Sequence, residues 1–160
     1  MAPIPYDNLV LNFTDDIIIN HHARLFRVSL TTNPCIFFIH VLFINPKIKS
    51  ASKKLTNFWH GCLSAKGQFR GQVSTYKSIS YEALDENLNK VSGKLDGMAA
   101  VIFQHEFRHL LSNLYVDYAT KLLDTEALNA ELENGNYDDL DECDNSIPHL
   151  LSDYKIGSAI

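Results

Sequence analysis

The longest apolar stretch with helical character covers residues 97–111. Nearly every residue from Met98 to Phe103 is apolar and the stretch shows no polar face, which is typical of a helix buried inside a core. Asp96 precedes the stretch and is an acceptable N-cap, since its side-chain oxygen can accept a hydrogen bond from a free amide of the first turn. The pattern therefore predicts a buried central helix.

Strand patterns come before this helix. Two strands are predicted, at residues 24–30 and 35–44, and they are joined by a turn that ends at Pro34. The second of these stretches is an apolar run rich in β-branched and aromatic residues. Residues 78–84 alternate polar and apolar positions, and 85–87 carry turn residues, so we expect a hairpin that returns through 88–95.

The intervening segments have different patterns. Residues 50–57 are polar and are expected to form a loop, and 61–71 contain three glycines and are expected to be irregular. After the central helix, 114–116 predict a short strand. The apolar positions within 118–132 then predict a second helix that starts near Tyr118.

The expected fold class is α+β, with antiparallel strands packed around a central metal-binding helix, plus a C-terminal helix. The length of 160 residues fits one domain, which we place at 1–133. Nine of the 19 acidic residues lie between Asp124 and Asp144, so we expect 134–160 to be an acidic, flexible extension.

Composition excludes several classes of protein. A net charge of −5 argues against a nucleic-acid binder, which would present a basic face. Three cysteines are too few and odd in number for a disulfide framework, so we expect the cytosol or another reducing compartment. Residues 1–12 do not have the pattern of a signal peptide, and no apolar run is long enough to predict a membrane helix.

The central helix carries a metal-site pattern. His105 and His109 are four residues apart, so both imidazoles project from one side of the helix, and Glu106 lies one residue round. His-Glu-x-x-His on a helix is typical of metal hydrolases, in which two histidines bind the ion and the glutamate acts as the base. Burying these groups among apolar residues would be costly unless something satisfies them, which favours metal binding over chance.

A catalytic site of this kind usually takes a third ligand from the protein and leaves one position for water. Cys62, in Gly61-Cys62-Leu63-Ser64, is the preferred candidate, with Gly61 giving the backbone freedom to turn the thiolate inward. The remaining candidates are the other two cysteines and His21, His22, His40, His60 and His149. Alternatively, Cys62 is a small buried apolar residue, as most cysteines outside disulfides are.

Two motifs together resemble those of peptide deformylases. Gly61-Cys62-Leu63-Ser64 is followed about forty residues later by Gln104-His105-Glu106-x-x-His109-Leu110, in the order that this family has. Further similarities are Leu42-Phe43-Ile44-Asn45-Pro46, Phe69-Arg70-Gly71 and Leu114-Tyr115-Val116-Asp117.

The resemblance implies a site and a reaction. Cys62, His105 and His109 would hold one divalent ion, with Fe²⁺ preferred and Zn²⁺ as the alternative. Glu106 would be the acid–base group. The backbone amide of Leu63 would stabilise the oxyanion. The expected substrate is an N-formylmethionyl peptide, including nascent chains at the ribosome, with no nucleic-acid or membrane partner. A methionine pocket would be lined by Phe58, Met98, Val101 and Ile102.

The chain also departs from the family pattern. The first motif, Gly-x-Gly-(apolar)-Ala-x-x-Gln, is absent, and residues 15–23 stand in its place. Asn20 and the paired histidines His21 and His22 are the candidates in this segment for a substitute donor. His60 replaces the usual glutamate before Gly61, and Arg108 replaces the usual aspartate before His109. Ser112 occupies the position of the glycine that ends the helix, and Asn113 is the expected left-handed residue.

Three functions therefore compete. The first is a deformylase; the second is a catalytically weak or inactive relative that keeps the metal site and binds a peptide or partner. The third, a metallopeptidase that uses only the helix motif, would make Gly61-Cys62-Leu63-Ser64 a coincidence. Retention of Glu106 favours the first, because a merely structural metal site has no need of a base.

Overall fold

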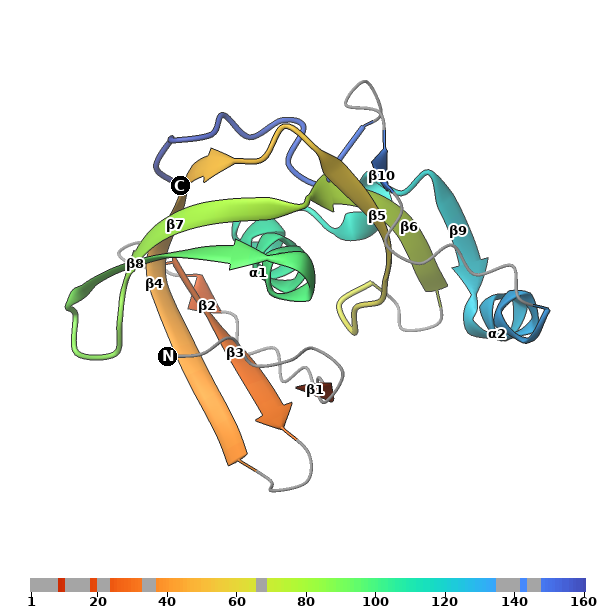
Figure 1. Cartoon of the computed structure of the whole chain (residues 1–160), viewed down its shortest axis with the longest axis horizontal. Coiled ribbons are helices and arrows are strands. Elements are labelled where there is room, and N and C mark those ends of the chain that lie inside the picture. The colour runs from red at the N-terminus through yellow and green to blue at the C-terminus, as the bar shows by residue number, and fades with distance from the viewer. Residues whose placement is uncertain are drawn as a thin grey trace.

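The fold is built from two antiparallel sheets and one long helix, as the computed structural model shows (Figure 1). The structure describes residues 9–10, 18–19, 24–32, 37–65, 69–134, 142–143 and 148–160. The strands are β1 (Leu9–Val10), β2 (Ile18–Ile19), β3 (Arg24–Thr32), β4 (Phe37–Ala51), β5 (Leu55–His60), β6 (Phe69–Tyr76), β7 (Ser78–Leu84), β8 (Lys90–Asp96), β9 (Lys121–Asp124) and β10 (Glu142–Cys143). The helices are α1 (Gly97–Leu110), the short 3₁₀ helix η2 (Tyr115–Asp117) and α2 (Thr125–Glu133).

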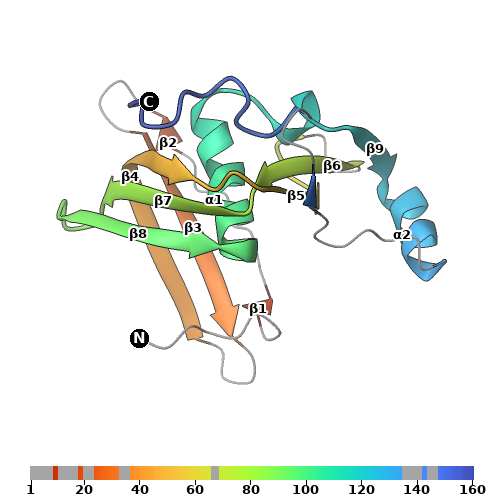
Figure 2. The same cartoon turned by 45° about the horizontal axis from the view of Figure 1, so that its top comes forward.

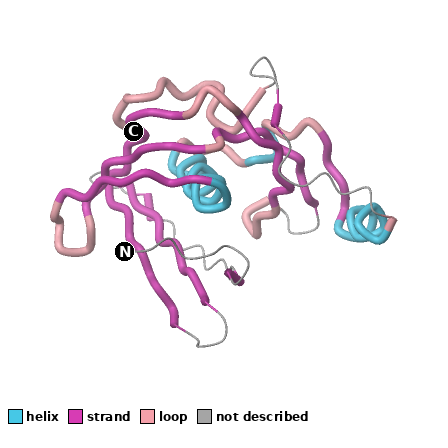
Figure 3. Tube along the Cα trace, in the orientation of Figure 1, coloured by secondary structure: helices cyan, strands magenta, loops and turns pink. Residues whose placement is uncertain are grey.

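Helix α1 contacts strands of both sheets. One sheet has the order β1-β3-β4-β7-β8, with β2 also paired to β3, and the other has the order β10-β5-β6-β9. Figure 2 shows α1 crossing the direction of β7 and β8, with β4 on one side of the helix and β5 and β6 on the other, and Figure 3 shows the elements coloured by secondary structure. The predicted α+β class is confirmed, with strands of both sheets packed around α1.

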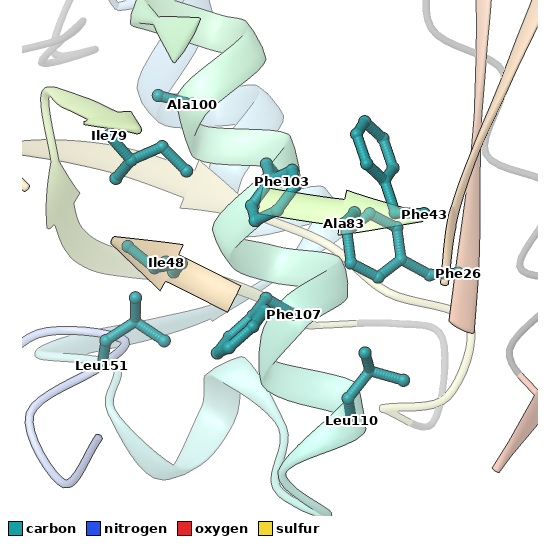
Figure 4. Packing of buried hydrophobic residues seen from close by; sticks show 10 residues of the cluster. All are labelled: Phe26, Phe43, Ile48, Ile79, Ala83, Ala100, Phe103, Phe107, Leu110 and Leu151. Atoms are coloured by element: carbon teal, nitrogen blue, oxygen red, sulfur yellow. The ribbon is translucent and has the colours of Figure 1, made fainter. Parts of the chain in front are cut away.

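The main core lies between α1 and the larger sheet (Figure 4). Phe103 of α1 meets Phe26 and Phe43 edge to face, with both pairs of ring centroids 5.1 Å apart, which is a favourable arrangement for aromatic rings. Val101, Ile102 and Phe103 are at most 5% exposed. The prediction of a buried central helix is therefore confirmed.

Local turn chemistry explains the β7–β8 hairpin. The side-chain oxygen Oδ1 of Asp85 accepts hydrogen bonds from the amides of Asn87 and Asn89, each at 2.9 Å, and the register pairs Leu84 with Lys90. Aspartate favours such turns because its side chain can substitute for a backbone acceptor. The predicted hairpin is confirmed.

Several predicted elements are wrong because tertiary pairing decides them. The helix expected from Tyr118 begins at Thr125, since Lys121–Asp124 instead forms β9 and pairs with Phe69–Gln72 of β6. The expected strand at 114–116 is the 3₁₀ helix η2. The expected loop at 50–57 is replaced in part by β5, in which Leu55 and Thr56 are buried.

Both ends of α1 also differ from expectation. Asp96 occupies the N-cap position but makes no side-chain capping bond, and the amide of Gly97 instead donates to the carbonyl of Lys77 at 3.1 Å. At the other end the left-handed residue is Ser112, with φ of 66°, rather than Asn113. The amide of Ser112 donates to the carbonyl of His109 at 3.0 Å, which closes the last turn.

The C-terminal residues 148–160 pack against the rest of the chain and cross α1 (Figure 2). Leu150 and Leu151 are at most 1% exposed, and the amide of Leu150 donates to the carbonyl of Ser74 at 2.9 Å. The domain boundary at residue 133 stays a prediction, and most of 134–147 lies outside the described residues. No helix in the described ranges is long and apolar enough to cross a bilayer.

Arg108 links this segment to α1. Its guanidinium is only 2% exposed and forms an ion pair with Asp153, in which Nη2 donates to Oδ2 at 3.0 Å. Nη1 also donates to the carbonyl of Leu150, and the guanidinium lies 4.5 Å from the ring centroid of Tyr118. Hydrogen bonds from Arg108 hold the pKa of Asp153 below its usual value.

We predict that Asp153→Asn lowers the free energy of unfolding at pH 7 by about 1–3 kcal/mol, because it leaves a buried guanidinium without its anion. A carboxyl whose pKa is lowered by folding stabilises the protein above its unfolded pKa, and this contribution disappears as the pH falls through the folded pKa. Urea titrations should therefore show the difference between wild type and variant begin to shrink below about pH 4, near the unfolded value, and disappear once the pH is below the folded pKa of Asp153.

Glu82→Gln is the matched control. Glu82 pairs with Lys49 at 3.0 Å across two exposed side chains, so its loss should change stability by less than about 1 kcal/mol. Equal stability of wild type and Asp153→Asn at pH 7 would contradict the proposed role of the ion pair.

Candidate metal centre

Three residues that can bind a metal converge beside α1. The ligand atoms of Cys62, His105 and His109 all lie within 4.8 Å of one another, and Sγ of Cys62 is 3.3 Å from Nε2 of His109. Ligands of one tetrahedral ion, each about 2.0–2.3 Å from it, lie roughly 3.5 Å apart. A thiolate and two imidazoles suit zinc or ferrous iron, so this group fits a single divalent ion.

The histidines owe their positions to the helix. A spacing of four residues places both rings on one side of α1, and their centroids are 5.0 Å apart. His105 is 6% and His109 8% exposed. Burial, followed by the charges of His60 and His109, holds the pKa of His105 well below its usual value. The imidazole is therefore neutral at pH 7, which is the form that binds metals.

Cys62 follows β5, and the glycine between them, Gly61, has a different role from the one expected. Among the described glycines, positive φ occurs only at Gly97 and Gly157, so Gly61 supplies no left-handed turn. A side chain at this position would instead meet the guanidinium of Arg70 at 2.8 Å. A larger residue at position 61 would therefore require the end of the Arg70 side chain to shift.

Glu106 lies between the two histidines in sequence and is 2% exposed. In metal hydrolases with a His-Glu-x-x-His helix the glutamate at this position is the base. Leu63, whose backbone amide is the expected oxyanion donor, follows Cys62 and has a side chain that is 78% exposed. The roles of both residues stay predictions.

A small cavity opens beside His105. Its volume is about 140 Å³, and its lining consists of Phe58, Trp59, His60, Gly61, Met98, Val101, Ile102 and His105. The structure thus brings together all four residues that the resemblance assigns to the methionine pocket. Substrate binding by these residues stays a prediction.

The remaining third-ligand candidates are not part of this group where their side chains are described. His149 contacts Tyr76, with Nε2 3.4 Å from the phenol oxygen. His60 is buried and touches His105, with the two Nδ1 atoms 3.0 Å apart. His21, His22 and Cys35 lie outside the described residues, as does Asn20, and the side chains of His40 and Cys143 are likewise not described.

The sequence pattern did not indicate which residues pack around the metal ligands. The ring of Tyr115 packs against both His60 and His105, at centroid distances of 6.0 and 5.8 Å. A Cβ at Gly71, the residue paired with His60 across β5 and β6, would lie 2.7 Å from that ring. A period-2 strand pattern at 69–76 could have suggested that Gly71 faces the site, but only the three-dimensional pairing shows what it contacts.

The comparisons with known proteins agree with this geometry. A model of the polypeptide deformylase family matches residues 17–124. The peptide deformylase of Psychrobacter cryohalolentis is 33% identical over 109 residues, which are 68% of this chain and 57% of the relative. Peptide deformylase 2 of Nostoc sp. is 40% identical over 108 residues, 64% of this chain and 59% of the relative.

Solved structures show the same relationship. The probable peptide deformylase of Synechococcus phage S-SSM7 matches with 38% identity and a TM-score of 0.55, over 59% of this chain and 63% of that one. The matched segment covers more than half of the chain, which therefore belongs to the polypeptide deformylase family. The chain spans less than two thirds of the length of these three relatives.

We predict that Cys62→Ser and His109→Ala each lower the metal content of the purified protein, because each removes one of three ligands. Elemental analysis after anaerobic purification measures the effect, with His149→Ala as the matched histidine control outside the group. A Cys62→Ser/His109→Ala double variant that retains one ion per chain would show that other residues bind the metal.

Proposed function

We propose that this chain is a metal-dependent deformylase that removes the formyl group from the N-formylmethionine of nascent polypeptides. The observation that supports this most is that the ligand atoms of Cys62, His105 and His109 lie within 4.8 Å of one another. Glu106, which follows His105 in the chain, is buried. Fe²⁺ is the proposed ion and Zn²⁺ the alternative. When bound, such an ion supplies a Lewis acid and lowers the pKa of its water.

In the proposed mechanism Glu106 transfers the proton. Its carboxylate accepts a proton from the water that attacks the formyl carbon, and it then donates that proton to the nitrogen of the leaving amine as the C–N bond breaks. The products are formate and a free N-terminal methionine. The backbone amide of Leu63 donates a hydrogen bond to the oxygen that gains charge during the attack.

The cavity beside His105 provides the proposed methionine pocket. Val101 and Ile102 of α1 form part of its lining together with Phe58 of β5. These apolar walls favour an unbranched, apolar side chain such as that of methionine. Because His105 is shared between the ligand group and the pocket, a side chain in the pocket would place its formyl group near the metal.

A second candidate function is a peptide-binding relative with little or no activity. The specific observation in its favour is the absence of the first Gly/Gln motif from the sequence. Loss of one oxyanion donor typically lowers turnover about a hundred- to a thousand-fold. The ligand group is present under either function, so activity separates the two.

We predict that Glu106→Gln abolishes formate release from formyl-Met-Ala-Ser by freshly prepared ferrous protein under argon, with its metal content unchanged. Glutamine has nearly the same shape but cannot accept the proton, and general acid–base catalysis typically contributes about a hundred- to ten-thousand-fold. Glu126→Gln, at an exposed position of α2, is the matched control and should retain full activity.

Each result discriminates between the hypotheses. An active wild type with an inactive Glu106→Gln supports the deformylase mechanism. A metal-loaded wild type that releases no formate would favour the peptide-binding alternative. Equal, clear activity of wild type and Glu106→Gln would show that another group transfers the proton.

A further inference from the structure

We propose that His60 is a positioning residue of the metal centre. Its Nδ1 accepts a hydrogen bond from the Nδ1–H group of His105. This bond fixes the tautomer of His105 in which Nε2 is free to bind the ion. This inference rests on the proposed metal centre but not on catalysis. It assigns a role to a residue that belongs neither to the ligand group nor to the acid–base chemistry.

The contact between the two imidazoles has the geometry of a hydrogen bond. The Nδ1 atoms are 3.0 Å apart, within the range for nitrogen donors and acceptors. The ring planes differ by only 11° and the ring centroids are 5.2 Å apart. Because the centroids are so much farther apart than the two Nδ1 atoms, the line between these atoms runs nearly through both ring centres, and the rings meet by their edges. Both side chains are at most 6% exposed, which keeps the contact away from bulk water.

Imidazole chemistry then determines the direction of the bond. A neutral imidazole has one N–H and one lone pair. Because Nδ1 of His105 faces His60, Nε2 is the atom left to bind an ion, and its lone pair must be free for that purpose. Nδ1 of His105 then carries the proton and donates a hydrogen bond to Nδ1 of His60. The remaining proton of His60 lies on Nε2, which has no hydrogen-bond partner among the described residues.

Partners of this kind usually orient a metal-binding histidine and raise its basicity, and most are carboxylates or backbone carbonyls. In this chain the acceptor is a neutral imidazole. A neutral acceptor withdraws the Nδ1 proton less strongly than an anion would, so His105 should donate less electron density to the metal. The expected consequence is a precisely oriented but moderately basic ligand.

The fold holds His60 in place from several sides. Its strand, β5, pairs with β6, and His60 lies opposite Gly71. The absence of a side chain at Gly71 leaves room for the ring of Tyr115, which packs against both imidazoles. The hydroxyl of Tyr115 donates to the carbonyl of Phe69 at 2.9 Å. The acceptor is therefore built on a strand and a buried aromatic ring rather than on an exposed loop.

The test compares His60→Leu with His60→Asn. Leucine removes the acceptor, whereas the side-chain oxygen of asparagine can occupy nearly the position of Nδ1. We expect His60→Leu to raise the dissociation constant for Co²⁺ about 10- to 100-fold, as is typical when such a partner is lost. His60→Asn should recover most of that loss. The measurement is an anaerobic titration followed by the absorption of the cobalt–thiolate bond.

His149→Leu is the matched control, since His149 also packs against a tyrosine but lies outside the ligand group. It should bind Co²⁺ with the affinity of the wild type. Circular dichroism of the metal-free variants establishes that each is folded. A folded His60→Leu variant with wild-type Co²⁺ affinity would overturn the proposal.

A second readout uses the wild type alone and does not depend on the folding of a variant. Nitrogen-15 NMR of histidine-labelled, zinc-loaded protein should show His105 protonated at Nδ1 and His60 protonated at Nε2. A His60 protonated at Nδ1 would contradict the inference. Neither readout involves formate release, so an inactive enzyme that meets both expectations would refute the proposed function while leaving the role of His60 intact.

Discussion

The structure depends on one constraint, which is that α1 buries a run of polar side chains within the core. Gln104, His105, Glu106, Arg108 and His109 are at most 8% exposed, and buried polar groups destabilise a fold unless they are paired. The side-chain amide of Gln104 bonds both backbone groups of Tyr76 in β6. His105 contacts His60 of β5, and His109 contacts Cys62, which follows β5. Arg108 forms hydrogen bonds to Asp153 in the C-terminal segment. These side chains of one helix thereby connect the smaller sheet, the C-terminal segment and the metal centre.

Much of the site could be predicted because its information is local. The i, i+4 spacing of His105 and His109 determines that both rings share a helix side, and the surrounding apolar residues determine that this side is buried. The β7–β8 hairpin likewise follows from the turn residues at Asp85. Cys62 is more distant in sequence, and the pattern alone left several ligand candidates open. The resemblance of its motif to one family was needed to select it.

The rest depends on contacts between distant segments, which no local pattern determines. Residues 121–124 have helical periodicity, yet they form β9 because β6 has an edge available for pairing. His60 and Arg108 replace acidic residues of the family pattern. The sequence alone did not show that His60 would face His105 or that Arg108 would pair with Asp153. In each case the partner lies 45 residues away in the chain, and a local sequence pattern cannot identify so distant a partner.

A metal ion enclosed by these buried side chains would have one sulfur and two imidazole ligands. X-ray absorption at the zinc K-edge of zinc-loaded protein measures these ligands. We expect one sulfur at about 2.3 Å and two imidazole nitrogens at about 2.0–2.1 Å, with the multiple-scattering pattern of histidine rings. A spectrum without the sulfur, or with oxygen ligands alone, would contradict this expectation.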